Sequence, residues 1–237
     1  MERDIIDCFW ASDFFGCAIA DFRGAQDILC PHCYLSGYNG VFIMKIFGKY
    51  IISAPESKAS AFSQIINRGR DLYRPDLLQS LLGTDYDEYI GPSWIGYPGH
   101  GGSIITEGCA LPLPKGDEKR HVLLEQLRAS CDPIEWSHCG IDESSEYIAV
   151  QCAGNMALSA ASHQTWGGKI AHIGIITHPQ FRGKGHAQRV LQSITAYSRQ
   201  QDLIPQYRTL CSNAPAIKAA VNCGYEEYAS HISIRLK

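Results

Sequence analysis

The chain has 237 residues, of which 45% are hydrophobic, and its formal net charge is −3 at pH 7. This length allows one large domain or two small ones, and the composition is that of a folded globular protein. Because the charge is near neutral, we expect no nucleic-acid partner. No apolar run is long enough to cross a bilayer, and no secretory signal is recognisable, so we expect no membrane partner and a cytoplasmic location.

The ten cysteines are scattered along the chain, which argues against a disulfide scaffold. The local cluster Cys30-Pro31-His32-Cys33 has the spacing of half a zinc site, and Cys8 and Cys17 could supply two more ligands. A single C-x-x-C is common by chance, and thiol redox chemistry is a second alternative. We therefore predict that no metal is needed, and zinc binding stays open as an alternative.

The N-terminal third is predicted to form a lobe of its own. The expected elements are strands at 40–47 and 49–53 and helices that begin at Pro55 and Pro75. The glycine-rich segment 98–102 is predicted to connect this lobe to the rest of the chain. We therefore predict two domains, residues 1–102 and residues 103–237.

The second domain is predicted to alternate strands and helices. The expected strands are 104–113, 147–152, 156–166, 169–177, 206–211 and 225–236, and the expected helices follow Asp117, span 187–200 and span 213–222. Gly154-Asn155 marks a hairpin between the second and third of these strands. The segment 133–136 is expected to lead into a variable, acidic stretch at 142–146.

Residues 171–200 carry the most informative pattern in the chain. Alternating residues over 173–177 predict a strand, and apolar residues at helical spacing over 187–200 predict an amphipathic helix. The turn 182–187 between them contains two glycines. A turn of this kind directs free backbone N–H groups and the positive end of a helix at one point, which favours a phosphate group there.

Within that stretch, Arg182-x-x-Gly185-x-Ala187 matches the Arg/Gln-x-x-Gly-x-Gly/Ala signature of the GNAT acyltransferase superfamily, which the chain from about residue 103 resembles. The resemblance implies an α/β (α+β) fold with a mixed central sheet that is splayed between its fourth and fifth strands and has flanking helices. The run Ile90-Gly-Pro-x-x-Ile-Gly-Tyr97 resembles the front half of two-lobed bacterial members. The N-terminal part would then be a smaller α/β lobe that closes the acceptor cleft or forms a homodimer contact.

The same resemblance implies an N-acetyltransferase. A primary amine of a small molecule would attack the thioester of acetyl-CoA directly, and no metal would be involved. Residues implied in binding acetyl-CoA are Ile175, Ile176, Thr177, Arg182, Gly183, Lys184, Gly185, His186, Ala187 and Asn213. Among them, the turn would hold the diphosphate, the strand and Asn213 would contact the pantetheine arm, and a backbone N–H near Ile175 or Ile176 would stabilise the oxyanion.

His172 is the candidate general base, since imidazole can take up a proton near neutral pH. The alternative is a strand histidine that is simply hydrogen-bonded in a polar groove. Lesser candidates for the base are His163, Glu143 and Glu146.

One position departs from the superfamily pattern: Ala220 stands where a tyrosine often acts as the general acid. Either Tyr207, Cys211 or Tyr228 protonates the thiolate instead, or the step runs without a dedicated acid. The missing tyrosine leaves open a second function, an acyl-CoA-binding sensor or interaction module without turnover. The acidic stretch near 135–146 could attract a cationic acceptor, or it could be a solvated surface.

Overall fold

The computed structural model describes residues 2–99 and 110–237. The chain divides into two compact units: unit 1 comprises Met1–Ile95, Leu210–Ser212 and Glu227–Lys237, and unit 2 comprises Gly96–Thr209 and Asn213–Glu226. The predicted boundary between residues 102 and 103 lies outside the described residues, so that domain division stays a prediction. In the described residues, no helix combines the length and the apolar character needed to cross a membrane.

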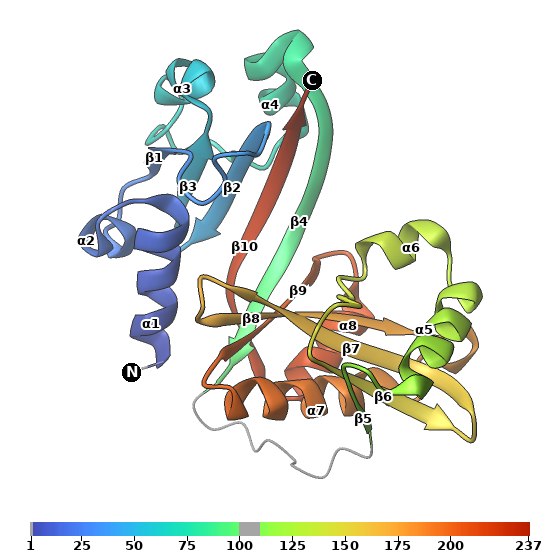
Figure 1. The fold of residues 1–237 in the computed structure, drawn as a ribbon. Coiled ribbons are helices and arrows are strands. Elements are labelled where there is room, and N and C mark those ends of the chain that lie inside the picture. The colour runs from blue at the N-terminus through green and yellow to red at the C-terminus, as the bar shows by residue number, and fades with distance from the viewer. Residues whose placement is uncertain (1, 100–109) are drawn as a thin grey trace. The chain divides into compact units, whose positions relative to one another are not determined.

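Unit 1 combines a small sheet with short helices (Figure 1). Its helical elements are α1 (Glu2–Cys8), the π-helix η1 (Phe9–Phe15), α2 (Ile19–Arg23), α3 (Glu56–Ser63), α4 (Pro75–Leu82) and the 3-10 turn η2 (Gly83–Asp85). Its strands are β1 (Ile28–Pro31), β2 (Gly40–Ile46), β3 (Lys49–Ala54) and most of β4 (Tyr86–Pro98) and β10 (Tyr225–Leu236). The strand β3 pairs parallel with β1 and antiparallel with β2, and β2 pairs antiparallel with β10.

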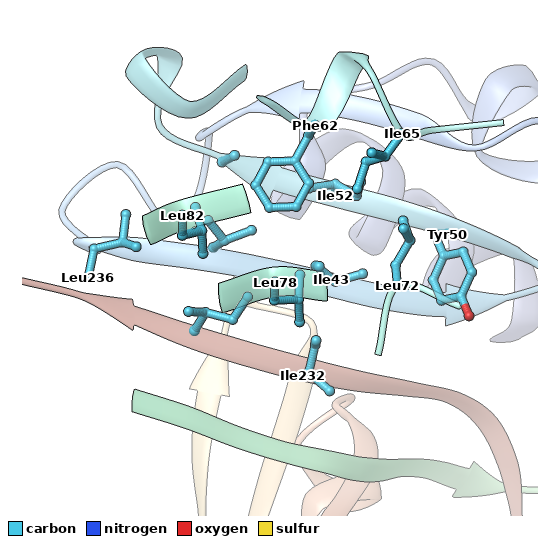
Figure 2. Close-up of a cluster of buried hydrophobic side chains, with 13 residues drawn as sticks. Ile43, Tyr50, Ile52, Phe62, Ile65, Leu72, Leu78, Leu82, Ile232 and Leu236 are labelled. Carbon is cyan, nitrogen blue, oxygen red and sulfur yellow. The ribbon is translucent and has the colours of Figure 1, made fainter. Parts of the chain in front are cut away.

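The core of unit 1 lies between this sheet and the helices α3 and α4 (Figure 2). In α4, Pro75 occupies the first turn, and Leu78 and Leu82 are four residues apart, so both side chains are buried on one face. They pack with Phe62 of α3 and Ile232 of β10. The predicted strands at 40–47 and 49–53 and the helices beginning near Pro55 and Pro75 are thus confirmed. The helices before residue 24 and the strand β4 were not predicted.

Unit 2 follows the predicted alternation of elements. In chain order these are β5 (Leu111–Pro114), α5 (Glu118–Ser130), α6 (Pro133–His138), β6 (Tyr147–Ala153), β7 (Met156–Trp166), β8 (Ile170–Thr177), η3 (Pro179–Phe181), α7 (His186–Gln200), most of β9 (Ile204–Leu210) and α8 (Ala214–Asn222). Asp117 caps α5, as expected, by accepting a hydrogen bond from the Lys119 amide. Of the predicted strand 104–113, residues 104–109 lie outside the described part of the chain.

The sheet of unit 2 is mixed, which confirms the predicted fold class. The strands β5, β6, β7 and β8 pair antiparallel in sequence order, whereas β8 and β9 pair parallel (Figure 1). The parallel register comprises only four pairs, from Ile170 with Ile204 to Ile173 with Tyr207. Beyond Ile173 the described residues of β8 and β9 are not paired. This early end of pairing is the predicted splay between the fourth and fifth strands.

Helices α5 and α7 cover opposite faces of this sheet. Ile176 of β8 is buried against Leu123, Leu124 and Leu127 of α5. Neighbouring positions of a strand alternate between faces, and His163, which lies on the other face of β7, is 2.8 Å from Ser198 Oγ of α7. His172 and Gly174 share the face of Ile176, since they are separated from it by even numbers of residues.

Candidate functional site

The turn between β8 and α7 has the backbone that the sequence predicts. Gly183 has φ +75° and Gly185 has φ +81°, a left-handed conformation that side chains with a Cβ disfavour. Within the described residues, none of the amide N–H groups from 183 to 187 donates a hydrogen bond to the protein. Five free donors therefore lie at the start of α7, where the helix dipole is positive. This arrangement suits a diphosphate.

The charged side chains at the turn differ in their partners. The Arg182 guanidinium donates to both Glu135 oxygens, at 2.7 and 2.6 Å, and its Nε donates to the Thr177 carbonyl at 3.2 Å. Lys184 lies with its Nζ 5.0 Å from the Phe181 ring centroid and remains exposed. Burial lowers the pKa of His186, whose Nδ1 has no partner among the described residues. Of these predicted contacts, only Arg182 is held in an ion pair.

On β8, the residues predicted to contact the pantetheine arm already interact with other protein groups. Thr177 Oγ1 is 2.8 Å from Ser159 Oγ, and the Ile176 side chain is buried in the core beneath α5. The Ile175 amide, which β9 no longer pairs, donates to the Cys139 carbonyl at 3.0 Å. The main chain of Gly140 lies so close to Gly174 that a Cβ on Gly174 would overlap it.

Residues 135–140, which we call the strap, thus engage the candidate site at two points. Glu135 pairs with the arginine of the turn, and Cys139 accepts from the amide of the splayed strand. The strap begins in α6, which was not predicted as a helix. Asp132 caps this helix by accepting from the Ile134 and Glu135 amides, and Pro133 occupies its first turn.

His172 belongs to a compact cluster on the face of Ile176. Its ring stacks on Trp166 with centroids 4.2 Å apart, and its Nδ1 is 3.2 Å from Gln206 Oε1. Gln206 Nε2 in turn donates to the Tyr97 hydroxyl at 2.5 Å. The Arg208 guanidinium lies 5.2 Å from the Trp166 ring centroid. Burial first, and Arg208 second, lower the pKa of His172 to about 3.

This environment defines the protonation of His172. An amide oxygen can only accept, so Nδ1 carries the proton and Nε2 has the lone pair. Nε2 makes no hydrogen bond to any described residue. With a pKa near 3 the ring is neutral at pH 7 and is a hydrogen-bond acceptor at Nε2, but it is a weak base. The environment in the absence of an acceptor therefore does not favour the predicted role of His172 as the general base.

The other candidates for proton transfer are placed as follows. Ala220 is fully buried in α8, and burial raises the pKa of Tyr207 to about 12, so this phenol stays protonated at pH 7. Cys211 and Tyr228 belong to unit 1, where the Tyr228 hydroxyl donates to Asp7 at 2.8 Å. Asn213 uses its side-chain oxygen to cap α8 at the Ala216 amide.

The acidic stretch is largely paired with basic groups. Glu135 binds Arg182, Glu143 binds Arg128, and Glu146 is 3.2 Å from Lys115. An open pocket of about 510 Å³ lies beside this stretch and is lined in part by Glu146 and Trp166. Because most of these carboxylates are already neutralised, the stretch is a poor source of attraction for a cation.

The described residues contain no group of three or more His, Cys, Asp or Glu side chains arranged to hold a metal ion. Cys8, Cys17, Cys30 and Cys33 therefore do not converge as the zinc alternative requires. In addition, His32 is engaged with Ser53 Oγ at 2.7 Å and the Gly40 carbonyl at 2.9 Å.

Sequence reasoning missed the strap, Trp166, Gln206 and Arg208. A usable signal existed for the last two, since Gln206 and Arg208 are two residues apart in the strand Ile204–Leu210 and so share one face. Glu135 gave no such signal, because nothing in the sequence relates it to a turn 47 residues away.

The turn, the splay and the order of elements in unit 2 together define a GNAT fold. Residues 119–225 match the model of the acetyltransferase (GNAT) family. The match covers a little under half of the chain, and residues 119–225 are thus similar to a GNAT acetyltransferase domain, in agreement with the resemblance in the sequence. No curated protein shows a significant match to the chain.

Several solved structures are similar to this chain. A GNAT-family acetyltransferase from Colwellia psychrerythraea is 17% identical, with a TM-score of 0.52, over 68% of this chain and 61% of that protein. A GCN5-related N-acetyltransferase from Sphaerobacter thermophilus is 15% identical, with a TM-score of 0.45, over 67% of this chain and 55% of that protein. A Salmonella typhimurium protein, solved with its cofactor acetyl-CoA, is 11% identical, with a TM-score of 0.39, over 54% of this chain and 94% of that protein.

Of these three likenesses, only the first exceeds a TM-score of 0.5, and at 17% identity it supports the fold alone. The match spans about six-tenths of the length of the Colwellia protein.

Proposed function

We propose that this protein transfers the acetyl group of acetyl-CoA to a primary amine of a small molecule. The observation that carries the proposal is the turn 183–187, whose five amides donate to no described protein group. Unused donors gathered at a helix start are costly unless solvent or an anion satisfies them. The diphosphate of coenzyme A is an anion of suitable charge and size.

The reaction is a direct displacement at the thioester. The amine nitrogen attacks the carbonyl carbon, a C–N bond forms, and the C–S bond breaks to release the coenzyme A thiolate. The nitrogen loses one proton and the thiolate takes up one, so the products are an acetamide and a free thiol. We assign acceptance of the amine proton to His172 Nε2, since this atom has a free lone pair and lies beside the splay of β8 and β9.

The strap must move before acetyl-CoA can use the Ile175 amide, and it competes for Arg182. Glu135 competes with a phosphate for the Arg182 guanidinium. The Cys139 carbonyl must leave the Ile175 N–H before a pantetheine carbonyl can accept a hydrogen bond from that N–H. The ion pair is exposed, with side chains 47% and 42% accessible, so its opening costs little. The strap therefore slows or weakens entry without preventing it.

The second candidate is an acyl-CoA-binding module without turnover. Two observations favour it: Ala220 offers no proton to the leaving thiolate, and the pKa of His172 is lowered to about 3. Such a module would bind acyl-CoA at the same turn but would leave the thioester intact. A homodimer stays a prediction for both functions.

One experiment separates the two functions. The purified protein is incubated with acetyl-CoA and a panel of small amines, and free thiol is followed with a thiol reagent, while calorimetry measures coenzyme A binding. Thiol release that depends on an amine supports the transferase. Binding without amine-dependent thiol release supports the module, and absence of coenzyme A binding rejects both. A Gly183→Trp variant, which fills the turn, is the control for binding at the assigned place.

A further inference from the structure

One charged side chain of unit 2 is not explained by the interactions around it. Arg208 is partly buried, yet no ion pair or hydrogen bond of the described residues involves its guanidinium. Arg68, Arg70 and Arg189 also have no such partner, but they are exposed and are solvated instead. A guanidinium that loses water without gaining a counter-ion is energetically costly. Arg208 therefore has no counter-ion among the described residues and is available to an anion.

Among the residues that the structure describes, no carboxylate forms an ion pair with Arg208. Burial lowers the pKa of Arg208 to about 10, and the only group that raises it is the Tyr97 phenol. The nearest aromatic ring, Trp166, makes a cation–π contact at 5.2 Å. This contact orients the guanidinium but leaves its N–H donors free for a planar anion.

The position of Arg208 in the sheet ties it to the proposed reaction. Tyr207 is the last β9 residue that pairs with β8, opposite Ile173, so Arg208 is the first residue beyond the pairing. Arg208 therefore lies level with Gly174 of β8. Thr177, the end of β8, is three residues further along the strand at about 3.3 Å per residue, and the phosphate turn comes after it. Arg208 is thus about 10 Å or more from the turn and is badly placed for the diphosphate of coenzyme A.

A second feature of the cluster is complementary to an ammonium or amine. His172, stacked on the same Trp166 ring, is neutral and presents the lone pair of Nε2. Trp166 thus contacts a cation, Arg208, and an uncharged acceptor, His172. One group suits a carboxylate and the other suits the amine that is to react.

We propose, on the basis of the proposed transferase function, that Arg208 binds a carboxylate of the acceptor, which is therefore an amino acid or a related amino carboxylate. The carboxylate forms a bidentate pair with the guanidinium, and the amine of the same molecule lies at His172 Nε2. Bound carboxylate also offsets the positive charge of Arg208, the second cause of the low pKa of His172. Acceptor binding thereby makes His172 a stronger base when the base is needed.

The first test compares matched acceptors. Phenylalanine, phenylalaninamide and phenethylamine, with glycine, glycinamide and methylamine as a second series, are assayed for kcat/KM with acetyl-CoA. We expect the free amino acids to exceed the amides and the decarboxylated amines by about 30-fold or more. Arg208→Gln should lower kcat/KM for the free amino acids to the level of the matched amides and amines, and so remove this preference, whereas the exposed-residue control Arg68→Gln should keep the preference unchanged.

The second test does not depend on turnover. Calorimetry measures binding of N-acetylphenylalanine and N-acetylphenylalaninamide to the wild type and to Arg208→Gln in the presence of coenzyme A. We expect the acid alone to bind, and only to the wild type. If the acid does not bind, or if Arg208→Gln binds it equally, the carboxylate site is rejected. If the acid binds as expected but no amine is acetylated, the carboxylate site stands and the transferase is rejected.

Both tests require that the Arg208→Gln variant is folded. Arg208 makes no hydrogen bond or ion pair with any residue in the described part of the chain, so Arg208→Gln should retain or raise the thermal midpoint of unfolding. Arg208→Lys, which retains the charge but not the bidentate geometry, should keep part of the preference for acids. A loss of the preference in Arg208→Gln together with full rescue by an uncharged Arg208→Met would contradict a charge-based site.

Discussion

Replacing Glu135 by Gln should tighten the binding of coenzyme A. Glu135 holds Arg182 in an ion pair at 2.6 Å, and this carboxylate competes with a phosphate for the guanidinium. The side chains are 42% and 47% accessible, and exposed pairs of this kind contribute about 0.2 to 1 kcal/mol. Removing the competing pair should return that free energy to coenzyme A binding and lower Kd by about 1.4-fold to about 5-fold at 25 °C.

The assay is isothermal calorimetry with coenzyme A at low and at high salt. The gain should shrink at high salt, because the competing pair is exposed and is screened. Glu125→Gln is the matched control, since Glu125 pairs with Arg128 at 3.0 Å with closely similar exposure in the same unit. In an Arg182→Gln background, Glu135→Gln should have no effect. Unchanged or weaker coenzyme A binding by Glu135→Gln, with Glu125→Gln behaving alike, would refute the competition.

Three further predictions concern the turn and the strand β8. Gly174→Ala should lower the free energy of unfolding by about 1 to 3 kcal/mol, measured by urea denaturation, because a Cβ there overlaps the Gly140 main chain. Gly185→Ala should cost about 1 to 2 kcal/mol and weaken coenzyme A binding in calorimetry, because its φ of +81° disfavours a Cβ at the diphosphate turn. The pKa of His172 is lowered to about 3 from an ordinary 6.5, so the unfolded chain binds the extra proton and stability falls as the pH drops below about 6.5. His172→Gln should remove up to about 1.4 kcal/mol of that loss per pH unit, measured by urea denaturation between pH 5 and 7.

Each of these has an outcome that contradicts it. An unchanged urea midpoint for Gly174→Ala would mean that the strap is not packed on β8 as described. For Gly185→Ala, the control Gly154→Ala has a similar left-handed φ of +59° in the hairpin after β6 and should lose stability but keep coenzyme A affinity. Equal losses of affinity in both variants would contradict a role for the turn. Identical pH dependence of His172→Gln and wild type would show that His172 titrates normally when folded.

Local signals in the sequence predicted the central part of unit 2. The conformation of the turn is local, because Gly183 and Gly185 adopt positive φ angles that glycine allows without any tertiary contact. The hairpin at Gly154 and the helix α7 are equally local, being set by turn chemistry and by helical periodicity. Such features can be inferred before any tertiary contact is known.

Other elements depend on contacts that a sequence pattern does not reveal. The helix α6 is six residues long, too short for a periodic signal, and it is held in place by its Asp132 cap and by Glu135. The strand β4 reads as a glycine- and proline-containing stretch, and Pro92 argues locally against a strand. The early helices α1 and α2 are likewise too short for a clear periodicity.

The early end of pairing between β8 and β9 accounts for both halves of the proposed site. Had the parallel register continued past Ile173 and Tyr207, the Ile175 amide would donate to a β9 carbonyl and would be closed to any other acceptor. Instead that amide donates to the Cys139 carbonyl, an acceptor outside the sheet that another acceptor can replace. The same early end leaves Arg208 beyond the last strand pair. The replaceable Cys139 carbonyl and the position of Arg208 are therefore consequences of one feature of the sheet. A variant in which β8 and β9 pair beyond Ile173 should lose coenzyme A binding and the preference for carboxylate acceptors together.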